Sequence, residues 1–193
     1  MVKRRLRNVM LFMTVLMMCS SSLSSISTSA AELSISIVTQ AKTEWCWAAS
    51  AEMAGKYAYS SSTRDQWDVV NHVHGTIFDS YPNKSGSIAN SASGSKHMTH
   101  NTKTFSYIAS AYTISQIRTS INTNSKPLQA GAGYYNSNGN RNGGHMVVIS
   151  GVTSTGETIT YLDPWDGTKH TCTLTAFGDA SYNGRKYDQT VYY

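Results

Sequence analysis

The chain has 193 residues and a formal net charge of +5, from 16 Lys and Arg against 11 Asp and Glu. Four of the basic residues lie within residues 3–7 and every acidic residue lies at or beyond Glu32, so the chain after residue 31 is nearly neutral. A nearly neutral chain with no basic cluster, no RNA-binding aromatic motif and no zinc-finger spacing excludes nucleic acid as an expected partner.

Residues 1–31 have the pattern of a secretory signal peptide. Basic residues at 3–7 are followed by an apolar run over 9–18, which is too short to span a membrane, and then by Ser29-Ala30-Ala31. We therefore expect residues 32–193 to form one secreted, extracellular domain with no stable membrane insertion after the signal is removed. The alternative is a lipoprotein anchored through Cys19, because this cysteine closes the apolar run.

Helical patterns dominate the first half of the expected mature chain. The run WCWAASAEMAGKYAY is rich in helix-forming Ala, Met and Glu, and its apolar residues recur three and four apart. In contrast, YPNKSGSIANSASGSK is poor in apolar residues, which is typical of a surface loop. Together the patterns predict a short lead-in strand over 32–39, helices over 45–59, 63–74 (capped by Ser62 or Thr63) and 113–122, and a long surface excursion over 76–106.

Strand patterns take over after Pro127. Apolar and polar residues alternate in short runs, and glycine-rich or polar turns separate these runs. Helices followed by strands, without a β-α-β alternation, indicate the α+β class. Strands are predicted over 127–135, 145–152, 158–165, 169–175 and 188–193, with a polar loop over 136–144 and a hairpin turn over 154–157.

Cys46 stands at the start of the first predicted helix, between Trp45 and Trp47. The dipole and the free N–H groups of a helix N-terminus favour negative charge, and therefore the reactive thiolate. A thiolate still needs a proton-handling partner before it can act as a catalytic nucleophile. Taken alone, Cys46 is better explained as a small buried residue packed among aromatic rings.

His145 and Asp163 are predicted to meet at one end of a hairpin. His145 opens the apolar strand HMVVI, directly after the Gly/Asn loop, and the turn over 154–157 folds the next strand back toward it. A neutral imidazole can take a thiol proton, and a carboxylate on its other ring nitrogen fixes its orientation. Alone, these residues are explained as an edge histidine and an Asp-Pro turn. With Cys46, they predict a catalytic triad.

Gln40 lies six residues before Cys46. A side-chain amide beside the backbone N–H of the cysteine would form an oxyanion hole for a tetrahedral intermediate. By itself, Gln40 is explained as an ordinary surface glutamine.

These residues make the sequence resemble the papain-like cysteine peptidases. The likeness is to compact bacterial members, namely the C39-like secreted peptidases, the staphopain type and a secreted effector peptidase of plant pathogens. It rests on Gln-x5-Cys-Trp at 40–47, Gly-His and an apolar strand at 144–149, and an acidic residue near a Trp at 163–165. It implies a two-subdomain fold in which N-terminal helices pack against a C-terminal antiparallel sheet, with a cleft between them. The implied roles are Cys46 as nucleophile, His145 as general base, Asp163 as third member of the triad and Gln40 in the oxyanion hole.

The resemblance further implies a monomeric thiol protease that cleaves a peptide or protein substrate and uses no cofactor or metal. Cys46 then cannot form a disulfide with Cys172, which is the other cysteine beyond the signal, so Cys172 is implied to be a free thiol facing the core. The sequence departs from larger papains at Thr43-Glu44-Trp45, where those enzymes have Cys-Gly-Ser before the nucleophile. The disulfide partners that such a run implies are also missing.

Other patterns offer competing hypotheses. The runs His72-Val73-His74 and His97-Met98-Thr99-His100, with Asp68 and Asp79, suggest a metal site, although the HExxH and CxxC spacings are absent. A carbohydrate or cell-wall platform is suggested by Tyr134-Tyr135, Tyr192-Tyr193 and Trp165.

The reaction also has alternatives. The same triad would serve an acyltransferase or a cell-wall peptide amidase, and the chain would be a secreted binding module if Cys46 were inert.

Overall fold

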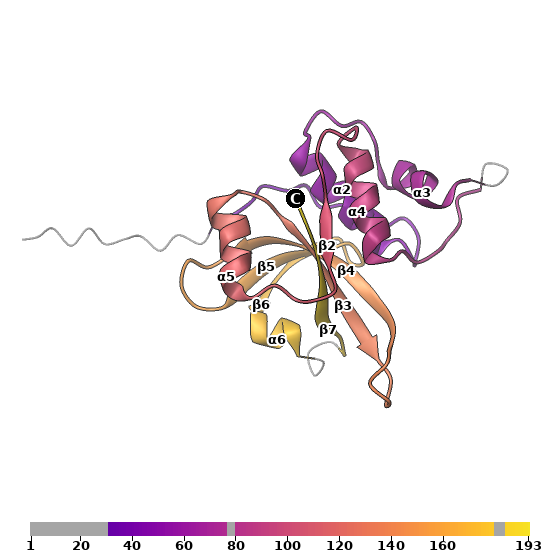
Figure 1. Cartoon of the computed structure of the whole chain (residues 1–193). Helices are drawn as coiled ribbons and strands as arrows, with labels where there is room; N and C mark the ends of the chain where they lie inside the picture. The colour runs from indigo at the N-terminus through magenta and orange to yellow at the C-terminus, as the bar shows by residue number, and fades with distance from the viewer. Residues whose placement is uncertain (1–30, 77–79, 180–183) are drawn as a thin grey trace, which may run out of the picture.

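The computed structural model describes residues 31–76, 80–179 and 184–193. The expected signal peptide up to residue 30, the alternative anchor Cys19 and Asp79 lie outside the described residues. In the described part, three helices precede six strands of a seven-stranded antiparallel sheet, whose remaining strand comes before the helices. Figure 1 shows α2, α3 and α4 gathered on one side of the molecule and the sheet on the other. The predicted α+β architecture is confirmed.

Helix α2 (Cys46–Ala58) begins one residue after the predicted start. Its residues from Trp47 to Gly55 are all buried, so the helix is surrounded by protein on every side. Small side chains allow this close packing, because a Cβ at Gly55 would lie 2.3 Å from the Cβ of Met98 in the neighbouring helix α4. The Ala-rich composition therefore predicts the helix and also explains its place at the centre of the helical half.

Helix α3 (Gln66–His74) starts three residues later than predicted, and Asp65 caps it in place of Ser62 or Thr63. The Asp65 carboxylate accepts from the N–H groups of Trp67 and Asp68, while the Asp68 carboxylate accepts from the N–H of Asp65. This reciprocal capping box satisfies N–H groups that a helix start otherwise leaves without partners. Gly75, with φ of 71°, follows the last helical residue His74, where the helix was predicted to end.

Helix α4 (Ile88–Met98) contradicts the predicted surface excursion over 76–106. Ser91, Gly94 and Ser95 are buried, and they serve as small core residues instead of loop residues. The hydroxyls of Ser91 and Ser95 hydrogen-bond the side-chain amide of Gln129 in the sheet, which is 1% exposed. Polar residues enter this core because each buried polar group has a partner, which a hydrophobicity pattern does not reveal.

The predicted helix over 113–122 is present as α5 (Ile114–Arg118), which continues into the π-helical turn η1 (Thr119–Thr123). Ile117 and Ile121 are buried against the sheet, as the periodicity predicts. A short helix α6 (Leu174–Gly178) was not predicted, and its Phe177 packs into the same cluster.

The strands pair in the order β2-β7-β3-β4-β5-β6, and β1 pairs with β4. The predicted hairpin is confirmed, with Val148 opposite Leu162. Two further predictions were wrong. Most of the lead-in segment over 32–39 is not strand, and the polar loop over 136–144 is partly strand, because β4 begins at Arg141. The strands are β1 (Ala31–Glu32), β2 (Ser106–Ile108), β3 (Leu128–Tyr135), β4 (Arg141–Val152), β5 (Thr158–Asp163), β6 (Thr168–Thr173) and β7 (Lys186–Tyr192).

Strand β4 joins the two halves of the molecule. Met146 packs in the cluster of Trp45 and Trp47, whereas Val147 and Ile149 pack in the cluster with α5 and α6. Both faces of the strand are therefore covered from His145 onward, which fixes its register. In the described part of the chain, no helix has the length and apolar character needed to cross a membrane.

Candidate active site

Cys46 is the first residue of α2 and is partly exposed. As the first helical residue, its backbone N–H has no acceptor within the helix. Trp45 and Trp47 on either side are buried, and their indole N–H groups donate to Pro82 O at 3.0 Å and Lys84 O at 3.1 Å. The two tryptophans therefore hold the start of α2 in place while the thiol between them remains accessible.

His145 and Asp163 are brought together as predicted. The His145 Nε2–H donates to the Asp163 Oδ1 at 2.5 Å, and both residues are buried. Burial alone would lower the pKa of His145, but the hydrogen bonds and charges of Asp163 and Cys46 outweigh it and raise the pKa to about 9. Because Nε2 is used by Asp163, Nδ1 is the ring nitrogen left for the Cys46 thiol.

Asp163 is held as a carboxylate. Burial would raise its pKa, but the hydrogen bond and charge of His145, together with the Trp165 N–H bond at 2.8 Å, lower the pKa below its ordinary value. This Trp165 bond also sets the direction of the carboxylate. The orientation of the imidazole is therefore determined by the turn that follows β5.

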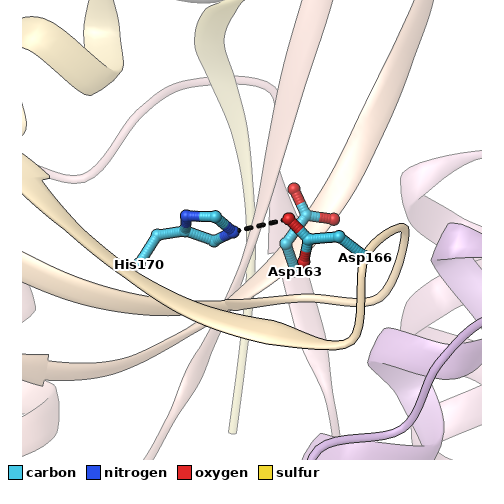
Figure 2. A group of neighbouring side chains, drawn as sticks. All are labelled: Asp163, Asp166 and His170. Carbon is cyan, nitrogen blue, oxygen red and sulfur yellow. Dashed lines mark hydrogen bonds and ion pairs between the residues drawn. The ribbon is translucent and has the colours of Figure 1, made fainter.

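Asp163 belongs to a group with Asp166 and His170, shown in Figure 2. One ligand atom from each lies within 4.8 Å of the others, a spacing compatible with a metal ion. In the structure, His170 Nε2 bonds Asp166 Oδ2 at 2.8 Å, and Asp166 Oδ1 accepts from the Thr168 hydroxyl at 2.8 Å. Asp166 and His170 thus bond each other across the turn, whereas Asp163 bonds His145 and the Trp165 N–H.

Cys46, His145 and Asp163 all open onto one cavity of about 940 Å³. The helical half supplies one wall, which includes Glu44 and the segment 85–88, and the sheet half supplies the other, which includes Tyr134 and Trp165. This is the cleft between subdomains that the sequence predicts.

Gln40 occupies a different position from the triad. It does not line this cavity, and its side-chain N–H groups donate to Lys42 O and Thr43 O, each at 2.9 Å. The Gln40 Oε1 is buried without a hydrogen-bond partner among the described residues. The amide therefore closes the turn that leads to Cys46, and its role in an oxyanion hole stays a prediction.

Both described cysteines are free, which confirms that Cys46 and Cys172 are not bridged. Cys172 is half-buried and packs against the hydrophobic cluster of the sheet, and this burial raises the pKa of its thiol. A buried thiol with a raised pKa is a poor nucleophile near neutral pH. Cys46 is therefore the thiol available for chemistry.

Of the residues behind the two competing hypotheses, the histidines at 72 and 97 do not line the cavity, whereas some of the aromatic residues do. His72 and His97 stack face to face, with ring centroids 4.3 Å apart and planes within 8°. Tyr192 packs on Tyr112, with ring centroids 5.6 Å apart, whereas the exposed Tyr134 and Trp165 line the cavity.

Sequence reasoning missed the segment 81–88, which lies against residues 43–47 around Cys46. The Asn83 side chain accepts from the Glu44 N–H at 3.0 Å and donates to the Thr43 hydroxyl at 2.9 Å. Gly86 lies on Trp47, and a Cβ there would be 2.3 Å from the indole ring. The Ser/Gly/Asn composition reads as a loop, and only the two indole N–H groups on either side of Cys46 signal that they need carbonyl partners.

Comparisons with known proteins agree with this geometry. The profile of the Peptidase_C39 like family matches residues 32–190. Among solved structures, the chain is similar to a double glycine motif protease from an AMS/PCAT transporter, crystallised in complex with the leader peptide. The two share 13% sequence identity and a TM-score of 0.50, over 83% of this chain and 91% of the other, so the likeness concerns the fold. No curated protein matches the chain.

Proposed function

The chain belongs to the Peptidase_C39 like family of cysteine peptidases, and from this premise we propose that it hydrolyses peptide bonds through Cys46, His145 and Asp163. The observation that carries the proposal is that the thiol at the start of α2 and the buried His145–Asp163 pair open onto the same cavity. Nucleophile, base and orienting group are then in the relation that covalent acyl transfer requires.

Acylation begins when the Cys46 thiolate, paired with the His145 imidazolium, attacks the carbonyl carbon of the scissile bond. The C–N bond breaks as the imidazolium gives its proton to the leaving amine, which leaves a thioester on Cys46. His145 then takes a proton from water, and the resulting hydroxide attacks the thioester to release the acid product. Throughout, Asp163 keeps Nε2 protonated and Nδ1 directed at the reacting groups.

The oxyanion is stabilised by the Cys46 backbone N–H and by Gln40. The N–H of Cys46 at the first position of α2 has no intrahelical acceptor, which suits it to an incoming anion. Gln40 Nε2 donates to Lys42 O and Thr43 O, and in this proposal one of its two N–H groups turns to the oxyanion when substrate binds.

A peptide or protein is the proposed substrate. A cleft of this volume with exposed aromatic rings suits an extended chain, and the similar double glycine motif protease was crystallised with a leader peptide. We also propose that the protein acts as a monomer outside the cell, after removal of residues 1–31.

Labelling by a thiol-directed peptide epoxide tests the proposal. The epoxide should modify one residue, Cys46, and block hydrolysis of a peptide library by the 32–193 protein. Cys172→Ala is the matched control, because it removes the other thiol and should leave labelling unchanged. Peptides that form new carboxyl ends support hydrolysis, whereas a crosslinked amide product would identify acyl transfer. A Cys46 that remains unlabelled while the protein is folded would overturn the proposal.

A further inference from the structure

The segment Thr39–Ala41 has no helix or strand of its own, yet it carries Gln40 between the two halves of the molecule. On one side, the Gln40 backbone N–H donates to Pro164 O at 2.8 Å, next to Asp163. Thr39 lies against the turn after Asp163, because a Cβ at Gly167 would be 2.4 Å from the Thr39 hydroxyl oxygen. Besides this backbone bond, the segment is held by a side chain that reaches it from outside.

Gln66 supplies those bonds from α3. Its side-chain Oε1 accepts from the Ala41 N–H at 2.8 Å, and its Nε2 donates to Thr39 O at 3.0 Å. One amide thus holds the backbone on both sides of Gln40. Gln66 is only 6% exposed, so little water is available to replace these bonds.

Gln66 is itself tied to the helix of the nucleophile. Its backbone N–H donates to the Glu52 Oε2 at 2.8 Å, and the Glu52 Oε1 pairs with Lys56 Nζ at 2.6 Å. Glu52 lies in α2, six positions after Cys46, and is 5% exposed. A continuous polar chain therefore runs from α2 through Gln66 to the Gln40 segment and on to Pro164.

We propose that Gln66 is a positioning residue, which acts through the Gln40 segment to set the oxyanion-binding turn against the Asp163 end of the sheet. The inference rests on the proposed function. Its effect should appear in the transition state more than in substrate binding, because Gln66 does not line the cavity. A misplacement of about 1 Å near a reacting centre is enough to slow catalysis on the order of 100-fold.

Steady-state kinetics of Gln66→Ala in the full 32–193 protein test the role. We expect kcat to fall by roughly 10- to 100-fold while KM changes by less than about 3-fold. Ser62→Ala is the matched control, because Ser62 donates a buried hydrogen bond to Met98 O at 2.7 Å and does not line the cavity. It should lower the thermal midpoint to a similar extent and leave kcat near the wild-type value.

Gln66→Glu adds a pH signature that a purely structural role would not give. The introduced carboxyl group can still accept from the Ala41 N–H, but it can donate to Thr39 O only while it is protonated. Its kcat relative to wild type should therefore be highest at the acid end of the profile and fall as pH rises. A constant ratio across pH would contradict the proposal.

A double-mutant cycle with Gln40→Ala separates this inference from the proposed function. If Gln66 acts through Gln40, the double variant should be little slower than Gln40→Ala alone. Fully additive losses, or a Gln66→Ala enzyme with wild-type kcat, would overturn the positioning role while the peptidase assignment stands. Absence of hydrolysis by the wild-type protein would instead count against the assignment itself.

Discussion

The helical half and the sheet half of the cleft hold their proposed catalytic groups by different means. Cys46 lies at the start of a helix. The tryptophans on either side of it are each fixed by one hydrogen bond, to the carbonyls of Pro82 and Lys84. His145 is placed by the register of β4, whose residues are buried from 145 onward. Side-chain bonds to an irregular segment control the nucleophile, whereas repeated strand pairing controls the base.

This difference has a physical consequence for substitutions. In a sheet, many ladder bonds share the task of positioning, and the loss of one is absorbed by the others. In the helical half, each positioning contact is made once, either by a long side chain that donates one hydrogen bond or by a small residue where two segments approach closely. The four substitutions that follow test the two halves separately.

Cys46→Ala should have the largest effect and should separate chemistry from folding in the helical half. Without the thiol no acyl-enzyme can form, so kcat should fall by at least about 10⁴-fold. The thiol is partly exposed and only partly packed against the Trp45 and Trp47 cluster, so the urea midpoint should stay close to wild type. Hydrolysis assays with equilibrium unfolding check both results. Full activity in this variant would end the assignment of the nucleophile.

Asp163→Asn applies the same test to the sheet half and adds a pH dependence. The pKa of His145 is raised from 6.5 to about 9, so the pair stabilises the fold fully below pH 6.5 and loses this contribution as pH rises through about 9. Activity that needs the imidazolium should fall in the same upper range. Without the carboxylate, kcat should fall by about 10²- to 10⁴-fold and the alkaline limb should move toward pH 6.5.

The alkaline limb can be followed in kcat/KM profiles and by NMR titration of the His145 ring. An unchanged limb in Asp163→Asn would show that another group sets the histidine pKa.

Gly55→Ala should weaken the packing of the helical half without changing the chemistry. The added methyl group meets the Cβ of Met98 at 2.3 Å, so α2 and α4 must move apart. We expect a loss of about 1–3 kcal/mol in the free energy of unfolding, which outweighs the better helix propensity of alanine. Gly178→Ala is the control, because a Cβ there has no heavy atom within 4 Å among its described neighbours. Equal stabilities of the two variants would contradict the close approach of the helices.

His97→Asn should have the smallest effect, confined to acid conditions. Burial, then the charges of His72 and Arg64, lower the pKa of His97 to about 4, against the opposing charge of Asp68. The unfolded chain therefore binds a proton that the folded chain does not, and stability falls as pH drops from about 6.5 to about 4. The variant should lose less stability between pH 7 and pH 4.5 in urea titrations. An identical acid loss would assign the effect to other groups.

The sheet half could be predicted from the sequence to a large extent. The runs HMVVISGV and TITYLD are typical of β-strands, and the turn between them fixes which ends of the two strands lie side by side. This is why the meeting of His145 and Asp163 was correctly predicted. The start of β4 was misplaced, because residues 141–144 are polar and glycine-rich yet still pair with β3.

The helical half was harder to predict because its core is built from residues that normally mark loops. Ser91 and Ser95 are buried because Gln129 of another element satisfies their hydroxyls, a partner far away in sequence. The role of Gln66 is hidden for the same reason, since its partners lie 25 and 27 residues earlier. Cys46 was accessible to prediction through its helix start, whereas the contacts that orient it were not.

The place of β7 in the sheet bears on when activity can first arise during synthesis. Its residues 186–192 are the last strand described, yet they lie between β2 and β3. Until the ribosome has made them, β3 exposes an unpaired edge next to the strand that carries His145. Cys46, His145 and Asp163 are all translated earlier, so the nascent chain holds the whole proposed triad before it can assemble the complete sheet. The order of translation therefore delays completion of the sheet, and with it the complete fold, until β7 has been synthesised.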